Sequence, residues 1–435
     1  MQSAERTSQS SGIGLSSATA IVIASMVGAG VFTTSGFLLA DLGSPAWVLA
    51  AWAVGGVVAA CGALCYGALA RALPGSGGEY HYLARAIHPA AGLMAGWISL
   101  LAGFAAPAAA AALGLQAYLT PWLGAAGAWS GSMAILAAGL LHGLRVAPGV
   151  WAQNSAVAVK LAMLLAFLAL AARAIGAGAG AEAAALPGGP ALPPPSWPAF
   201  AASLVWVSFC YSGWNAATYV GAEIRDSARN LPRALLIGCG IVTVLYLAVN
   251  GTILAAAAPE QLAGREDVAA AAAIALGGGW TLTLLRLAAA LALFTSVSAL
   301  LQGGPRVAAR MAEDGFLPRI FAVRGTDAAP RAAVALQCAL ALALVWWAGL
   351  RELLGAIGFT LGLCVAATVA ALIRLRRMRG AAAVPVPGWP VTPMVVIAAT
   401  LGSSLFLALR EPRIALWGAA AIAAGLPLLL LRRRR

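Results

Sequence analysis

The chain has 435 residues, of which 62% are hydrophobic and only 9% are charged. A soluble domain of this length needs far more polar residues to cover its surface, so the composition excludes one and indicates a protein that lies in a lipid bilayer. The net charge of +13 is compatible with a nucleic-acid or acidic partner or with the topology of a membrane protein, and its distribution along the chain decides between these.

Crossing the hydrocarbon core takes about 20 apolar residues in a helix. Runs of that order predict twelve membrane helices, at residues 14–40, 46–70, 91–119, 129–143, 150–175, 198–222, 234–258, 270–302, 331–350, 353–374, 391–410 and 412–431. The fourth run is short and the last two are hardly separated, so the count can differ by one. No cleavable signal peptide is expected, because the first residues are polar and the first apolar run is too long.

The arginines are distributed unevenly between the two sides of the predicted bundle. With the N-terminus inside the cell, the inner side holds Arg6, Arg71, Arg85, Arg145, Arg225, Arg229, Arg233, Arg306, Arg310, Arg319, Arg324, Arg331, Arg374, Arg376, Arg377, Arg379 and Arg432 to Arg435. The outer loops hold only Arg265, Arg351, Arg410 and Arg413. This positive-inside pattern predicts a multi-pass protein of the cell (inner, cytoplasmic) membrane with both termini cytoplasmic. A nucleic-acid partner is not expected, because no soluble domain carries a basic cluster.

The residues that bind metals or form disulfides are scattered. All six cysteines lie within or beside apolar runs, where a thiol behaves as a small hydrophobic group. His81, His88 and His142 lack the spacing of metal ligands. We expect no disulfide, metal or other cofactor. A membrane-embedded enzyme or sensor is disfavoured, since no cluster of His, Asp and Glu lies inside a span and the loops are too short for a signalling domain.

Residues 176–197 are rich in proline and glycine and predict an outer loop. The loop separates a first block of five helices, 14–175, from a second block, 198–374. An odd number of helices per block inserts the second block upside down, which is the inverted-repeat arrangement of transporters with a site at the midplane. The other predicted parts are a cytoplasmic N-terminal tail, two further helices and a basic cytoplasmic tail, at residues 1–13, 375–431 and 432–435.

Each block opens with a helix that is interrupted at mid-span, by Gly28-Ala29-Gly30 in the first and by Ser212-Gly213 in the second. Lipid cannot satisfy the freed backbone groups, so the pair of breaks predicts a binding site between the repeats. After the first break, the next half-helix would present free N–H groups to a carboxylate. Before the second break, the preceding half-helix would present free carbonyls to an ammonium.

Together these two ends suit an α-amino acid. Side chains close to the breaks, Phe32, Phe209, Tyr211, Trp214 and Asn215, are candidates to shape or gate the pocket. The alternative is packing, because Gly-x-Gly in a membrane helix more often lets two helices approach closely. Two breaks in corresponding positions of the two blocks favour the binding interpretation.

Lys160 is the only lysine and lies within the fifth predicted helix. A charge at the centre of a helix costs about 2.5 to 3.5 kcal/mol on insertion, so this side chain should face the bundle interior. Two roles of Lys160 remain open, proton coupling and a fixed cation in place of sodium. The purely structural alternative is that its ammonium snorkels to the interface, as we expect for the side chains of Arg173 and Arg286. No acidic residue is found deep in a span, Glu223 being at the end of the sixth helix, and this favours neutral cargo.

Motifs of one family are spread over most of residues 12–375. They are Gly30-Val31-Phe32, Leu42-Gly43-Ser44-Pro45, Gly62-Ala63-Leu64-Cys65-Tyr66, Ser76-Gly77-Gly78-Glu79-Tyr80, Phe209 to Asn215 with Glu223, Asn230-Leu231-Pro232-Arg233-Ala234, Ser296-Val297-Ser298, Pro305-Arg306 and Asp314-Gly315-Phe316-Leu317-Pro318. Together they resemble the amino acid–polyamine–organocation superfamily and, within it, the L-type amino-acid transporters and their bacterial relatives. The likeness fades over the last two helices.

The resemblance implies an all-α, LeuT-type inverted-repeat fold, discontinuous first and sixth helices, and exchange or proton-coupled movement of amino acids by alternating access. The implied site residues are the carboxylate positions Val27, Gly28, Ala29 and Gly30, the family lysine Lys160, the ammonium and gating positions Phe209, Cys210, Ser212 and the adjacent Gly213, and the polar positions Ser296 and Ser298. The segment Gly75 to Tyr82 resembles a short re-entrant stretch that helps to close the inner side.

Two departures from the family refine the expectation. Ser212 stands where relatives tend to have glycine, which narrows the pocket and disfavours very large side chains. The outer segment 120–128 contains no cysteine, so the disulfide to an accessory glycoprotein in animal members has no counterpart and no such partner is expected. We predict a secondary transporter of small to medium neutral L-amino acids. The alternative, a cationic amino-acid or polyamine antiporter, would need an acidic pocket residue.

Overall fold

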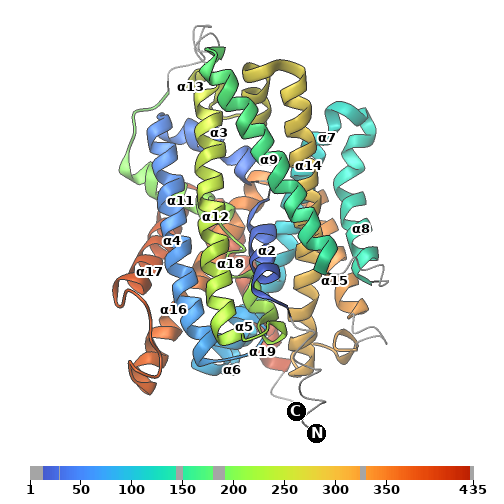
Figure 1. Cartoon of the computed structure of the whole chain (residues 1–435). Coiled ribbons are helices and arrows are strands. Elements are labelled where there is room, and N and C mark those ends of the chain that lie inside the picture. Colours follow the sequence, from blue (N-terminus) through green and yellow to red (C-terminus); the bar gives the residue numbers. More distant parts are fainter. Residues whose placement is uncertain (1–12, 29, 144–149, 180–191, 324–329, 432–435) are drawn as a thin grey trace.

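The computed structural model describes residues 13–28, 30–143, 150–179, 192–323 and 330–431. Within these ranges the regular elements are all helices, apart from one isolated bridge between Ile13 and Ile224. The long helices run roughly side by side and form one bundle (Figure 1). The predicted tails 1–13 and 432–435, Ala29, and Arg145 and Arg324 of the inner loops lie wholly or mostly outside the described residues.

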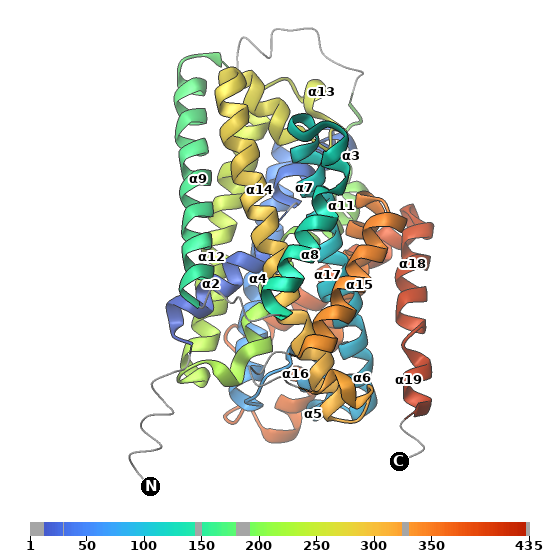
Figure 2. The same ribbon diagram turned by 90° about the vertical axis from the view of Figure 1, so that its right-hand side faces the viewer.

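The first half of the bundle contains α2 (Leu15–Met26), α3 (Gly30–Leu42), α4 (Pro45–Ala72), α5 (Gly78–Ala86), α6 (Pro89–Ile98), the π-helical η1 (Ser99–Ala105), α7 (Ala106–Leu123), η2 (Gly124–Trp129), α8 (Ser130–Gly143) and α9 (Val150–Gly176). The second half contains α11 (Trp197–Cys210), η3 (Ala216–Glu223), α12 (Ser227–Ala255), α13 (Pro259–Leu262), α14 (Val268–Glu313), η4 (Arg319–Phe321), α15 (Arg331–Trp347), α16 (Leu350–Arg379), α17 (Val391–Arg410), α18 (Pro412–Ala423) and α19 (Leu426–Leu431). Short α13 lies at one end of the bundle, and α5 and α6 reach the other (Figure 2); we call these the α13 end and the α5 end.

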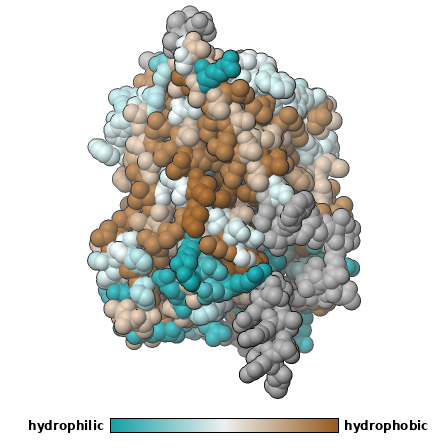
Figure 3. Space-filling view, viewed as in Figure 1, coloured by the Kyte–Doolittle hydropathy of each residue, from teal (hydrophilic) through white to brown (hydrophobic). Residues whose placement is uncertain are grey.

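Eight helices of the described chain are long and apolar enough to cross a membrane, or nine if α2 and α3, which meet at 43°, form one broken span. Large apolar side chains such as Trp280 and Trp347 are 75% and 88% exposed. Apolar surface covers much of the middle of the face in Figure 3, and hydrophilic residues gather toward the α5 end. Contact between such an apolar surface and water is unfavourable, whereas contact with lipid tails is not. The fold is therefore that of a multi-pass membrane protein.

Each of the twelve predicted runs overlaps at least one observed helix, but several boundaries differ. The run 198–222 is not one helix, because α11 ends at Cys210 and η3 begins only at Ala216. The run 270–302 belongs to the longer α14, which bends at Gly277 and Gly278. Gly278 has a φ of +64°, a conformation that glycine adopts without a steric cost. The run 412–431 is divided between α18 and α19.

Candidate functional site

The two breaks contact each other in the middle of the bundle. Gly213 has a φ of +94°, and a Cβ atom there would lie 2.8 Å from the carbonyl carbon of Ser25. A Cβ atom at Gly30 would lie 3.2 Å from Cys210 Cβ and 3.3 Å from its Cα. All three distances are shorter than ordinary van der Waals contact, so glycine at each break is needed for the close approach of α2, α3 and the end of α11.

This contact also encloses a cavity of about 70 Å³, here called the central cavity. It is lined by both breaks and by neighbouring helices, including Ser25, Met26, Gly28, Gly30, Phe209, Cys210, Ser212, Gly213, Asn215, Tyr219 and Ser296. Packing and cavity formation are therefore not alternatives at these glycines. Because α3 begins at Gly30, N–H groups without partners inside the helix and the positive end of its dipole lie at the cavity wall, an arrangement that suits an anion.

The end of α11 forms another part of the wall, and its carbonyls are partly used. The N–H of Ser212 donates to the Phe209 carbonyl at 2.8 Å. The hydroxyl of Tyr246, from α12, lies 2.9 Å from the Cys210 carbonyl and 2.6 Å from that of Met26 at the end of α2. Fully buried Tyr246 thus bridges the two broken helices. Sequence reasoning missed it, although a hydroxyl at the middle of the apolar run 234–258 was a usable signal.

Lys160 and Ser296 meet at the first break. Lys160 Nζ donates to the Val27 carbonyl at 3.2 Å, and Ser296 Oγ donates to the same oxygen at 2.9 Å. Val27 does not line the cavity with its side chain; its carbonyl faces these two donors. Lys160 is fully buried, so the interpretation that it snorkels to the interface is wrong. Its position instead fits a fixed donor that stabilises the unwound end of α2.

Among the predicted site residues, Ser298 and Phe32 line neither of the two cavities at the breaks. Ser298 Oγ lies 2.9 Å from His142 Nε2 of α8, so the grouping of Ser298 with Lys160 and Ser296 does not match the structure. Two positions along a helix differ by about 200°, which turns Ser298 away from Ser296. Phe32 is fully buried, with its ring against that of Tyr118 at 6.1 Å between centroids.

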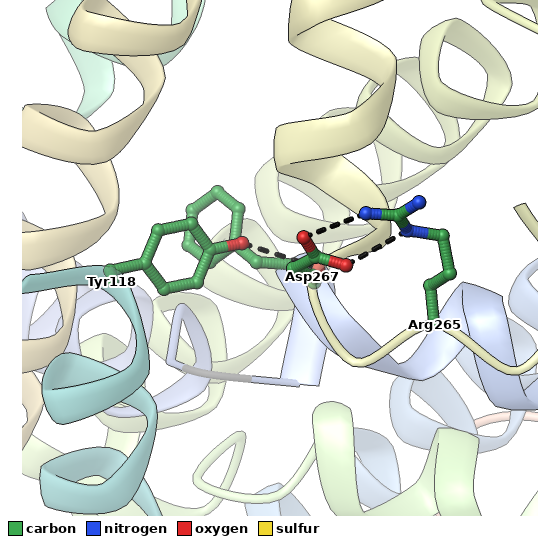
Figure 4. A network of polar contacts seen from close by, with 4 residues as sticks. Tyr118, Arg265 and Asp267 are labelled. Atoms are coloured by element: carbon green, nitrogen blue, oxygen red, sulfur yellow. Dashed lines mark hydrogen bonds and ion pairs between the residues drawn. The ribbon is translucent and has the colours of Figure 1, made fainter. Parts of the chain in front are cut away.

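Phe32 and Tyr118 lie toward the α13 end, where the segment that joins α13 to α14 contacts α3. Gly264 N–H donates to the Gly36 carbonyl at 2.8 Å. Figure 4 shows Tyr118 beside Asp267, whose carboxylate accepts two bonds of 2.9 Å from the Arg265 guanidinium. Those bonds hold the pKa of Asp267 below its usual value. Arg286 lies over the Trp122 ring at 5.8 Å, also in this region.

A second cavity of about 70 Å³ lies on the other side of the α11 break. Phe209, Ser212, Gly213 and Asn215 line both cavities, whereas Tyr211 and Trp214 line only the second. The Tyr211 hydroxyl donates to the Trp52 carbonyl at 3.0 Å, and the Trp214 ring packs on Tyr66 at 4.6 Å between centroids. The predicted pocket aromatics therefore line different spaces, and Phe209 is the one of them that lines both cavities.

Glu79 corrects the expectation that no carboxylate lies within the bundle. It is only 3% exposed, lines the second cavity, and accepts hydrogen bonds from the Tyr66 and Tyr219 hydroxyls and the Asn215 amide. Glu79 lies outside the long apolar runs, in the short helix α5, which begins at Gly78 directly after Gly77; both glycines have a positive φ. The argument against cationic cargo from missing acids therefore does not hold.

The six cysteines are free, and the described residues contain no group of three or more His, Cys, Asp and Glu that could hold a metal ion. The fold and site thus define a multi-pass, all-helical membrane protein with two broken helices around a small cavity. A family model described as amino acid permease matches residues 13–421, so the chain belongs to the amino acid permease family.

Several curated relatives are transporters. The large neutral amino acids transporter small subunit 2 of Mus musculus is 29% identical over 374 residues, which is 84% of this chain and 70% of the relative. The Asc-type amino acid transporter 1 of Mus musculus is 28% identical over 442 residues, which is 98% of this chain and 82% of the relative. An uncharacterized transporter of Mycobacterium bovis is 33% identical over 350 residues, covering 80% and 76%.

Proposed function

We propose that the chain is a secondary transporter that carries small to medium neutral L-amino acids across the cell membrane by alternating access. One observation supports this above the others: the start of α3 and the end of α11 line the same buried cavity. A helix start favours a carboxylate, and helix-end carbonyls favour an ammonium. The names of the relatives, which refer to large neutral and Asc-type amino acids, agree with a zwitterionic substrate.

The size of the cavity limits the cargo. A single water needs roughly 10 to 15 Å³ of cavity volume. The central cavity, of about 70 Å³, therefore accommodates only a few heavy atoms besides the carboxylate and ammonium groups at the breaks. Ser212 lines both cavities and adds a hydroxymethyl group between them. Small side chains, such as those of alanine and serine, fit this space directly, and larger ones require Phe209 to move.

We also propose how the chain is arranged in the membrane. Twelve crossings form a five-plus-five inverted repeat followed by two helices, both termini are cytoplasmic, and the α5 end faces the cytoplasm, as the arginine distribution predicts. We further propose that the chain works without an accessory glycoprotein, because segment 120–128 has no cysteine for a bridging disulfide. Purified alone, it should transport at a rate that added membrane proteins do not raise.

The test is a counterflow screen with the purified full chain in liposomes. Vesicles are loaded with one unlabelled amino acid at a time, and entry of labelled L-alanine is followed, with protein-free vesicles as the control. We expect alanine, serine and other neutral L-amino acids to drive entry and arginine not to do so. Arginine transport without alanine transport would contradict the proposal. Repeating the alanine assay with an imposed pH gradient separates exchange from proton symport.

Glu79 favours a second candidate, an antiporter of cationic amino acids or polyamines. Its carboxylate lines the second cavity, beside residues that also line the central one. A long cationic side chain that displaced Phe209 would reach toward it. Repeating the screen with labelled L-arginine decides, in vesicles loaded with unlabelled arginine or a polyamine. This candidate requires the labelled arginine to enter and Glu79→Gln to abolish that entry.

A further inference from the structure

Glu79 lies where three spaces meet. Its partner Asn215 lines the central and second cavities. Its partner Tyr219 lines the central cavity and a third, larger cavity of about 470 Å³ at the α5 end. The third cavity has charged walls, which include Arg85, Arg306 and Glu223. Tyr219, itself only 8% exposed, therefore forms part of the wall between the central cavity and the α5 end.

The carboxylate holds this wall by hydrogen bonds from two segments. Oε1 accepts from the Tyr66 hydroxyl of α4 at 2.9 Å and from the Asn215 amide. Oε2 accepts from the Tyr219 hydroxyl at 2.5 Å. The backbone from Ser212 to Glu223, which follows the second break, is thereby anchored to α4 and α5 through one side chain. A hydrogen bond to an ionised carboxylate is about twice as strong as one between neutral groups.

The groups around Glu79 do not include a basic partner in the described chain. Its titratable neighbours are Tyr66 from α4, Tyr82 from α5, Tyr219 from η3 and Cys364 from α16, and α6 contributes none. Within the described residues, no ion pair includes Glu79. The titratable groups of the third cavity lie around a space that Tyr219 also lines; they are His81, Arg85, Arg306, Arg310, Glu223 and Glu313. Within the described residues, the Glu79 carboxylate is thus held by hydrogen bonds and not by a basic side chain.

We propose that ionised Glu79 keeps the central cavity closed toward the cytoplasm by holding Tyr219 and Asn215, and that protonation of Glu79 opens this wall. A hydronium ion in the third cavity would transfer a proton to Oε2, which forms an O–H bond there and leaves water; no bond between heavy atoms changes. Tyr219 could then no longer donate a charge-assisted bond, so its ring and the segment after the break are released. The proposal rests on the proposed function in taking the central cavity as the substrate site and the α5 end as the cytoplasmic one.

The consequence is a direction for pH control. Acidification of the cytoplasmic side should raise the fraction of molecules whose central cavity opens inward. Glu79→Gln imitates the protonated acid, because an amide has the same shape and no charge. This variant should behave at neutral pH as the natural protein behaves at acidic pH.

The test measures access to Cys210, which lines the central cavity, and does not require any substrate. The full chain is exposed in inside-out vesicles to a membrane-impermeant maleimide, and mass spectrometry separates the label on Cys210 from that on the other five cysteines. The thiolate fraction of Cys210 changes with pH in the same way in both proteins. The ratio of the labelling rate in Glu79→Gln to that in the natural protein at each pH therefore reports only how far the wall limits access to Cys210.

We expect this ratio to be roughly tenfold near pH 8, the change that follows when closure is weakened by about 1.4 kcal/mol, and to fall toward one at acidic pH. Cys210 of the Tyr219→Phe variant should also be labelled faster than that of the natural protein at alkaline pH. Tyr82→Phe is the matched control, because the buried Tyr82 hydroxyl lies beside the same cluster and has no hydrogen-bond partner among the described residues; Cys210 of this variant should be labelled at the natural rate.

Two outcomes would overturn the proposal. A ratio of one at every pH means that Glu79 does not hold the wall, and a raised ratio that does not change with pH means that no proton controls it. Failure of the amino-acid screen is distinguishable from both. If no amino acid drives counterflow while the labelling ratio falls with pH as expected, the wall stands and the substrate assignment does not.

Discussion

Gly28 and Gly30 are two residues apart, yet their surroundings differ. A Cβ atom at Gly28 would meet Ser296 Oγ at 3.6 Å, an ordinary contact, whereas one at Gly30 would press on Cys210. We expect Gly28→Ala to retain most counterflow and Gly30→Ala to lose most of it, because α3 must move away from α11. Leucine at either position should abolish substrate binding without preventing insertion.

The measurement is L-alanine counterflow at equal amounts of folded protein, checked by gel filtration. Gly30→Ala combined with Cys210→Ala should recover part of the activity, since the sulfur atom makes the shortest of these contacts. Equal activity of the two single alanine variants would contradict the assignment of Gly30 to the contact between the breaks.

Lys160 shares its acceptor with Ser296, and this predicts non-additive effects. Lys160→Ala should impair exchange, but Ser296 still donates to the Val27 carbonyl. The double variant with Ser296→Ala leaves that buried carbonyl without either donor, which costs about 1 to 3 kcal/mol. Thermal unfolding in detergent should show a larger loss for the double variant than the two single losses combined. Normal transport with unchanged pH dependence in Lys160→Ala would leave the lysine a structural role only.

At the scale of elements, α12 joins the two broken helices through Tyr246. Tyr246→Phe removes the hydroxyl shared by the Met26 and Cys210 carbonyls. We expect a destabilisation of about 1 to 3 kcal/mol, a lower melting temperature and reduced counterflow. Tyr82→Phe again serves as control, since its hydroxyl bonds to nothing in the described chain. Equal melting temperatures for the two variants would show that the bridge contributes nothing.

The closure at the α13 end should not respond to mild acid. Arg265 holds the pKa of Asp267 below its ordinary value of 3.8. A carboxylate with a lowered pKa adds stability above that value and loses it only as the pH falls through the lower one. From about pH 8 to about pH 5 the pair therefore stays ionised. Asp267→Asn should leave the shape of the transport pH profile unchanged over this range, and a shifted profile would be the contrary result.

The elements also show what the sequence can and cannot predict. Apolar length located the helices, and small residues located both breaks, since each signal is local. The bonds that hold the breaks are not local: Met26, Val27 and Cys210 are joined by side chains from α9, α12 and α14. Glu79 was missed for a related reason, because its burial depends on a short helix that is apolar only in part.

At the scale of the whole molecule, the proposed orientation can be checked with matched exposed positions. Ala177 follows α9, and Ala382 follows α16; both are exposed. An impermeant thiol reagent should label Ala177→Cys only from outside the cell and Ala382→Cys only from inside. Labelling of both from one side would contradict the predicted orientation and the number of crossings between them.

The direct contact between the breaks has a consequence for how the chain is made. Ribosomes synthesise α2 and α3 well before Gly213, which follows α11, and before α12 and α14, which supply Tyr246 and Ser296. Until those segments arrive, Lys160 of α9 is the only one of these donors available to the carbonyls of the first break. The nascent first half therefore keeps polar backbone at membrane depth without its later partners, and quality-control proteases should remove chains truncated before α12 faster than chains truncated after α14.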